Sequence, residues 1–144
     1  MDRTFTLDEA NGLLPLLEAL LRSAMNSNER LHQLHEELQE IRQRVFLSGG
    51  SLLDMSRLLA LRREGDENVQ QVRDKVAEID AMGVQVKDLE MGLLDFPCRV
   101  DDETILLCWK AGEPAISYWH GLEEGFKGRK PINPRITRSK SRPN

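Results

Sequence analysis

The chain has 144 residues, of which 40% are hydrophobic, 31% are charged and seven are aromatic. A chain of this length can bury the core of a single domain, and this composition favours a helix-rich soluble protein over a β-sandwich or a disordered chain. No apolar run approaches the roughly 20 residues that a membrane helix requires. Because the N-terminal residues also lack the apolar core of a signal peptide, we expect a cytoplasmic protein without a membrane partner.

The net charge of −4 is unevenly distributed along the chain. Residues 1–126 contain 13 Lys and Arg against 24 Asp and Glu, whereas residues 127–144 contain seven basic residues and no acidic one. Because the last segment also has three prolines, we expect a single domain at 1–126 and a basic, largely unstructured tail at 127–144. Such a tail can contact nucleic-acid phosphates or its own acidic domain. The absence of aromatic residues from this tail argues against base stacking, so nucleic acid is not the favoured partner.

The first predicted element is a long helix. Residues 6–9 (Thr-Leu-Asp-Glu) have the pattern of a capping box, and Phe5 is placed to pack against Ala10. From about Leu7, apolar residues recur every seven positions, which predicts a helix of about 40 residues with a coiled-coil seam. Pro15 lies in the first turns, where it removes a backbone hydrogen bond and should kink the helix.

A second helix is predicted to return antiparallel to the first after the Gly-rich turn at 48–51. The polar segment 62–67 is either a solvated stretch of one long helix or a break between two helices. Because apolar spacings of three and four continue on both sides of it, we favour one continuous but weakened helix that ends at Met82 with Gly83 as its left-handed cap. The predicted hairpin spans 7–82. Because two helices cannot enclose their own apolar seams, we expect a homodimer with a four-helix arrangement, or a hairpin that lies across the rest of the fold.

The hydrophobic period changes to two residues after Gly83. Runs of strand-forming residues occupy positions 84–87, 92–99, 104–110 and 115–120. Turn signals at Asp101-Asp102 and at 111–114 separate the last three runs. The sequence therefore predicts an α+β fold, in which the long antiparallel helical hairpin is followed by a small antiparallel β-meander over 84–120.

One candidate metal site lies on the first helix. His32 and His35 share a helix face near Glu36 and Glu40, and paired histidines at this spacing bind a transition metal when a facing helix adds a ligand. The return helix has no His or Cys, however, and leucines occupy the seam positions. A solvated polar face is therefore the better interpretation.

The predicted sheet carries more candidates, namely Asp88, Asp95, Cys108, Glu113 and His120. A set of carboxylates and an imidazole can hold a divalent metal or perform general acid–base chemistry. No two of these residues have a diagnostic metal-ligand spacing. The alternative, which we favour, is structural: a turn residue, a cap for backbone N–H groups and a histidine hydrogen-bonded among aromatic residues.

The two cysteines, Cys98 and Cys108, flank a predicted turn. A thiol pair, a disulfide and two unrelated buried thiols are all compatible with their positions. We favour buried thiols, because two cysteines are too few for a disulfide framework.

Several strings of residues resemble a known family. They are Phe5 to Asn11 with Leu14-Pro15, Val86-Lys87-Asp88, Gly92 to Pro97, Leu107-Cys108-Trp109, Gly112-Glu113-Pro114 and Trp119-His120. Over about residues 4–132 the chain resembles an uncharacterised bacterial family, domain of unknown function 2203. The resemblance implies a bacterial protein with a single domain, and it implies no activity. Positions that match the family pattern are Glu9, Asn11, Asp88, Asp95, Cys108, Glu113, Trp119, His120 and Arg129.

This pattern suggests a polar pocket where the start of the first helix meets the sheet, with Trp109 and Trp119 as its walls. The candidate pocket residues are Glu9, Asn11, Asp88, Asp95, Trp109, Glu113, Trp119, His120 and Arg129. Within this pocket, Asp95, Glu113 and His120 are the candidate ligands of a divalent metal.

Two functions are compatible with these features. The first is a dimerising interaction or scaffold module that associates through the hairpin. The second is a metal- or small-ligand-binding protein, or an enzyme, that uses the polar pocket.

Overall fold

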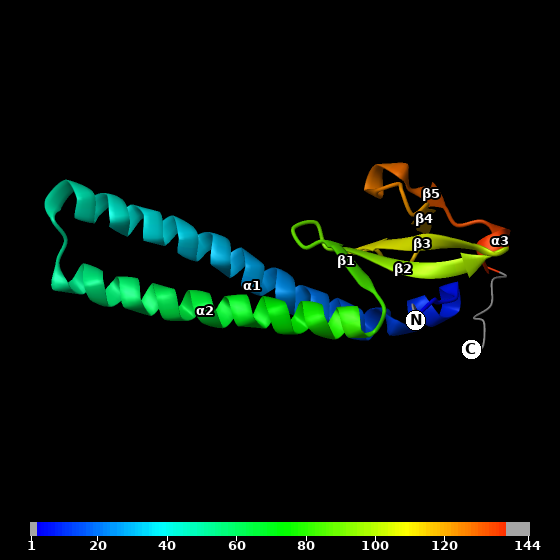
Figure 1. Ribbon diagram of the computed structural model, residues 1–144, viewed down its shortest axis with the longest axis horizontal. Coiled ribbons are helices and arrows are strands. Elements are labelled where there is room, and N and C mark those ends of the chain that lie inside the picture. Colours follow the sequence, from blue (N-terminus) through cyan, green and yellow to red (C-terminus); the bar gives the residue numbers. More distant parts are fainter. Residues whose placement is uncertain (1–2, 138–144) are drawn as a thin grey trace.

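The computed structural model describes residues 3–137 and shows an elongated molecule with two regions (Figure 1). Helices α1 (Leu7–Ser48) and α2 (Leu52–Ala81) form a long antiparallel hairpin. A small sheet packs against one end of this hairpin, and the other end extends away from the sheet. We call residues 30–70, the extended end, the arm, and the remaining described residues the head.

Helix α1 begins as its sequence predicts. The Thr6 hydroxyl accepts a hydrogen bond from the Glu9 N–H at 3.1 Å, and the Glu9 carboxylate accepts one from the Thr6 N–H at 2.8 Å, which completes the capping box. The helix runs for 42 residues and includes Pro15. The Phe5 N–H donates to the Pro97 carbonyl at 2.7 Å and ties the start of α1 to the sheet.

Helix α2 is continuous through the polar segment 62–67, as predicted. Ser51 caps its first turn, and Met82 follows its last residue. Gly83 then adopts a φ of 88°, and a Cβ at this position would approach the Arg3 side chain to 2.9 Å. A glycine is therefore required where the chain leaves α2 and enters the sheet.

The sheet is an antiparallel meander in the order β1-β2-β3-β4-β5. The strands are β1 (Gln85–Asp88), β2 (Leu93–Val100), β3 (Glu103–Lys110), β4 (Tyr118–His120) and β5 (Lys130–Pro131). Asp101 and Asp102 have φ values of 48° and 66°, the left-handed conformation that a two-residue hairpin turn requires. The predicted α+β class and meander are confirmed, although β4 begins later than the predicted run at 115–120.

The predicted unstructured tail needs correction, because residues up to 137 are part of the fold. The 3₁₀ turn η1 (Phe126–Gly128) and β5 follow β4, and helix α3 (Pro134–Thr137) comes next. Ile136 is 1% exposed and packs in the main core. Polar composition predicted disorder because it cannot reveal that strand pairing and one apolar side chain anchor this segment. Residues 138–144 of the predicted tail lie outside the described residues.

The main core lies between α1 and one face of the sheet. Phe5 and Phe96 meet edge to face at its centre, with ring centroids 5.7 Å apart. The other buried side chains on these two surfaces are Ala10, Leu14, Leu17, Leu21, Leu94, Cys98, Leu107 and Trp109. The hairpin therefore lies across the sheet at its base, while a separate small cluster of Leu34, Ile41 and Leu61 holds the arm together.

Candidate functional site

A buried polar cluster lies on the sheet face opposite α1. Asp95 on β2 pairs directly with Cys108 on β3, and His120 on β4 pairs with Leu106, two residues from Cys108. Because side chains alternate along strands, these three point to the same face. Their exposed fractions are only 1 to 2%. The imidazole Nε2 of His120 lies 3.1 Å from each carboxylate oxygen of Asp95.

The hydrogen bonds of His120 define its tautomer. Its Nδ1 lies 2.8 Å from the carbonyl oxygen of Gly121, and a carbonyl can only accept, so Nδ1 carries a proton. Nε2 is therefore the nitrogen that faces Asp95. This arrangement leaves Nε2 to share a proton with the carboxylate or to bind another partner.

Cys108 is a protonated thiol in this cluster. Burial raises the pKa of the Cys108 thiol to about 12, with a further contribution from the negative charge of Asp95, to which the thiol is hydrogen-bonded. A nucleophilic cysteine needs the opposite, a lowered pKa and a basic partner that removes its proton. The raised pKa of the Cys108 thiol therefore disfavours a thiolate in this cluster.

A covering segment, residues 121–130, closes this face of the sheet (Figure 1). The Arg129 guanidinium stacks on Tyr118, 4.1 Å from the ring centroid, and on Phe126 at 4.7 Å. Its Nη2 also donates to the Glu113 carboxylate at 2.6 Å and to the Cys108 carbonyl at 3.3 Å. Arg129 thus joins the covering segment to the sheet at the backbone of Cys108, one of the three cluster residues.

Glu124 fixes the covering segment from within. Its carboxylate accepts hydrogen bonds from the Lys130 ammonium at 2.5 Å and from the Gly121 N–H at 2.8 Å. The bond from Lys130, followed by that from Gly121, holds the pKa of Glu124 below its ordinary value. The segment is consequently held at both ends, at Gly121 and at Lys130.

The predicted metal ligands do not all meet. Among the described residues, the His, Cys, Asp and Glu side chains whose ligand atoms all lie within 4.8 Å of one another are Asp95, Cys108 and His120. Glu113 is not in this group, because its carboxylate accepts from Arg129 and from the Lys110 N–H at 2.7 Å. Cys108 thus stands where the sequence analysis placed Glu113.

The predicted pocket is divided between the two faces of the sheet. At the helix–sheet junction, Asn11 accepts from the Ile116 N–H at 2.9 Å, and the Trp109 indole donates to the Glu113 carbonyl at 2.9 Å. A groove of about 470 Å³ lies there, lined in part by Asn11, Trp109 and Glu113. Asp95 and His120 lie on the other face of the sheet. They pair with Cys108 and Leu106, whose side chains point away from that of Trp109 because side chains alternate along a strand.

The remaining predicted pocket residues have local contacts. Glu9 forms the capping box, Asp88 accepts from the Met91 N–H at 2.9 Å, and Trp119 lies under the Lys130 ammonium, 4.5 Å from the ring centroid. Cys98 is buried in the main core, on the sheet face opposite Cys108. Both cysteines are buried and neither forms a disulfide, so the prediction of buried thiols is confirmed.

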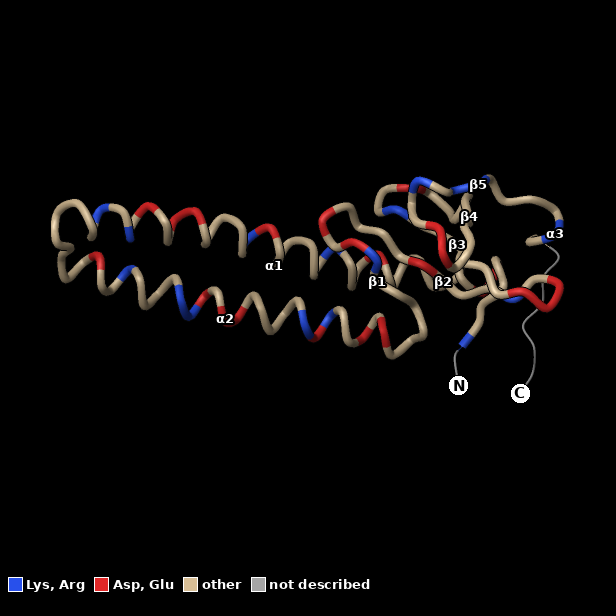
Figure 2. Tube along the Cα trace, turned by 45° about the horizontal axis from the view of Figure 1, so that its top comes forward, with Lys and Arg blue, Asp and Glu red and all other residues tan. Residues whose placement is uncertain are grey.

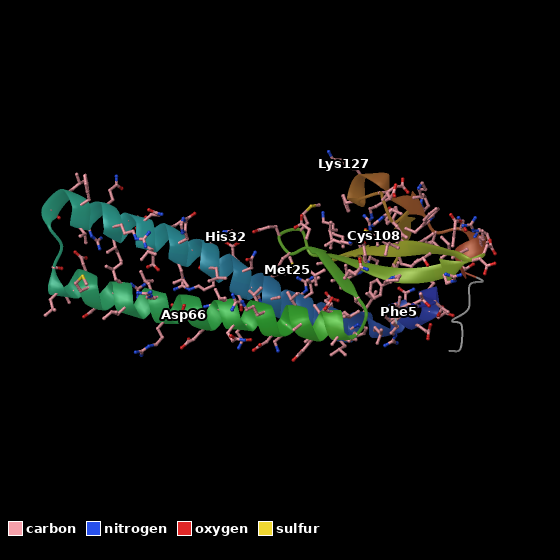
Figure 3. The ribbon with its side chains drawn as sticks, in the orientation of Figure 1. Phe5, Met25, His32, Asp66, Cys108 and Lys127 are labelled. Carbon is pink, nitrogen blue, oxygen red and sulfur yellow. The ribbon has the colours of Figure 1, made fainter. Side chains whose placement is uncertain are left out.

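His32 links the arm to the head. Its Nε2 lies 2.6 Å from the carboxylate of Glu90, in the turn between β1 and β2, and Figure 3 labels His32 on this part of α1. The hydrogen bond with Glu90, then the charge of Glu90, raises the pKa of His32 above its usual 6.5. The same contact lowers the pKa of Glu90. His35 instead lines a groove of about 620 Å³ between the arm helices.

The end of the arm exposes large apolar side chains. Six of them, on both sides of the hairpin turn, have exposed fractions between 54 and 88%: Phe46, Leu47, Leu52, Leu53, Met55 and Leu59. Charged residues of both signs are distributed along the same helices (Figure 2). We call these six side chains the apolar tip.

The structure defines an α+β protein that combines a sheet head, with a buried Asp–Cys–His cluster, and a helical arm with an apolar tip. The family model described as "Uncharacterized conserved protein (DUF2203)" matches residues 3–132, and the chain belongs to this family. No curated protein and no solved structure matches the chain. Within residues 3–137, no helix has both the length and the apolar character to cross a membrane.

Proposed function

We propose that this protein is an interaction module that dimerises through its arm, with a second copy of the chain as the partner of the apolar tip. The observation that carries this proposal is the exposure of six large apolar side chains at one end of the molecule. Soluble monomers rarely expose contiguous apolar patches larger than a few hundred Å², and larger patches mark interaction sites.

The size of the apolar tip fits a stable interface. A standard protein–protein interface buries about 800 Å² on each partner and has an apolar centre. Six large apolar side chains that are each more than half exposed supply a substantial part of such a centre.

A second copy suits the tip because the arm is only half of a stable helical bundle. Two helices bury one shared seam, and two such hairpins together enclose a four-helix core. Residues 30–70 carry six Lys and Arg and seven Asp and Glu, so two arms approach without strong repulsion. The groove between the helices is bordered by Arg42, Arg62 and Asp66, which offer both signs of charge to a copy related by two-fold symmetry.

Sedimentation equilibrium of the full chain tests this proposal. We expect a monomer–dimer equilibrium at micromolar concentrations. The substitution Leu53→Glu should raise the dissociation constant by at least about 100-fold, because it places a charge among the apolar side chains that the dimer would bury.

Leu122→Glu is the matched control. Leu122 is another exposed leucine, at 61%, but it lies in the head. Its substitution should leave the dissociation constant unchanged. A wild-type chain that remains monomeric at 100-fold higher concentration, or a dimer that responds to Leu122→Glu and not to Leu53→Glu, would overturn the proposal.

A further inference from the structure

The Asp–Cys–His cluster contains a buried carboxylate, that of Asp95, which dimerisation through the arm does not explain. A carboxylate that is 1% exposed is costly to bury unless a cation or several donors compensate its charge. The described hydrogen-bond partners of the Asp95 carboxylate are the imidazole of His120 and the thiol of Cys108. The nearby cation, Arg129, is bound to Glu113 and to a backbone carbonyl.

From this geometry we propose that Asp95, Cys108 and His120 bind a divalent transition-metal ion of the zinc type, which fastens three strands of the sheet beneath the covering segment. This inference concerns the head and is independent of dimerisation through the arm.

The tautomer of His120 suits a metal ligand. In most metal sites, the ring nitrogen that does not bind the metal donates its proton to a carbonyl or a carboxylate, and this bond fixes the ring. The Nδ1–H of His120 donates to Gly121 in this way, at 2.8 Å. Nε2, the ring nitrogen that faces Asp95, would bind the metal once the proton between them is displaced.

The separations between the ligand atoms are close to those of a tetrahedral site. Bond lengths of about 2.0–2.3 Å place neighbouring ligands of zinc roughly 3.3–3.8 Å apart. Nε2 of His120 lies 3.1 Å from the Asp95 oxygens, and all three ligand atoms lie within 4.8 Å of one another. The side chains would therefore have to draw slightly closer around the metal, because the widest of these separations exceeds that of zinc ligands.

The combination of donors indicates the class of metal. A thiolate and an imidazole favour zinc and similar transition metals, whereas calcium and magnesium prefer oxygen ligands alone. When the metal enters, the thiol proton of Cys108 leaves, as does the proton shared by His120 and Asp95. Two positive charges replace two protons, so the net charge of the buried site does not change.

Burial favours a stabilising role for the metal. All three residues are at most 2% exposed, and the covering segment is held at both ends by Glu124. Structural zinc sites usually have four protein ligands, and the described residues supply three, so the fourth position is left to water or to the second oxygen of Asp95. Because the site is enclosed, binding is expected to stabilise the fold of the head.

Cobalt titration of the full chain, purified without a histidine tag and stripped of metal, tests the site. We expect one Co²⁺ per chain, a thiolate-to-cobalt charge-transfer absorption and displacement of the cobalt by Zn²⁺. Asp95→Asn should weaken cobalt binding at least about 10-fold, since it removes an anionic ligand.

The second buried cysteine provides a matched control. Cys98→Ala, on the opposite face of the sheet, should keep the charge-transfer absorption, whereas Cys108→Ala should abolish it. If the wild-type chain binds no cobalt, or if the absorption survives Cys108→Ala, the site does not exist.

X-ray absorption of the zinc-loaded wild-type chain decides the question without any variant, so a Cys108→Ala protein that fails to fold leaves the test intact. One sulfur neighbour at about 2.3 Å, with nitrogen and oxygen neighbours at about 2.0–2.2 Å, is the expected shell. A shell without sulfur would refute the proposal.

Discussion

Helix α1 passes through both regions of the molecule, and its two parts are buried in different ways. In the head, its buried residues are Ala10, Leu14, Leu17, Leu21 and Ala24, with spacings of four and three. In the arm they are Leu34 and Ile41, seven residues apart. The head part packs against both the sheet and α2, whereas the arm part has only α2 beside it. The number of neighbouring layers, more than the helix itself, therefore decides how much apolar surface is buried.

The largest expected difference between head and arm is in the loss of unfolding free energy when a phenylalanine in each is replaced by alanine. Phe96→Ala removes a ring from the centre of the main core and should lower the free energy of unfolding by about 3–5 kcal/mol. Phe46→Ala, at 88% exposure in the arm, should change it by less than about 0.5 kcal/mol. Urea denaturation, at a protein concentration where the chain is monomeric, measures both values. Equal losses would mean that the arm is as tightly packed as the head.

A second pair of substitutions compares ion pairs in the two regions. Arg129→Ala removes a mostly buried guanidinium that bonds Glu113 and stacks on two aromatic rings, and should cost about 2–3 kcal/mol. In the arm, Arg57 donates to Glu37 at 2.8 Å, but both side chains are solvent-exposed. Arg57→Ala should therefore cost about 0.2–1 kcal/mol. Thermal unfolding of the two variants would contradict this comparison if Arg57→Ala were the more damaging.

The smallest expected effect is the pH dependence of the contact between arm and head. The pKa of His32 is raised by Glu90, so the stability from this contact is fully present below pH 6.5 and is lost as the pH rises through the pKa of folded His32. The pKa of Glu90 is lowered, so its contribution is present above 4.5 and is lost at more acidic pH. NMR titration of His32 should give a midpoint above 6.5.

The carboxylate of Glu90 is the source of this shift and can be removed. Glu90→Gln should bring the midpoint of His32 back toward 6.5, whereas Glu67→Gln, elsewhere in the arm, should leave it in place. A His32 midpoint that does not respond to Glu90→Gln would show that the arm and the head are not joined at this contact in solution.

Much of the fold was predictable because its signals are local. The capping box at Thr6, the left-handed Gly83 and the Asp101-Asp102 turn each depend on the backbone preferences of a few neighbouring residues. The pairing of Asp95 with Cys108 was also within reach of the sequence. In a hairpin with a two-residue turn, residues at equal distances before and after the turn pair with each other. Asp95 and Cys108 lie equally far from the turn at 101–102. Residue types alone favoured Glu113, because they contain no information about this register.

The sequence by itself determined the long helical hairpin, the meander and the presence of Asp, Cys and His side chains in the second half of the chain. Only the tertiary structure decided which of these side chains meet. Strand alternation sends Trp109 to the helix side and Cys108 to the opposite side, and the contacts of Arg129 withdraw Glu113 from the cluster. Contacts of this kind join residues far apart in the chain, and their energies depend on packing and burial that local patterns do not contain.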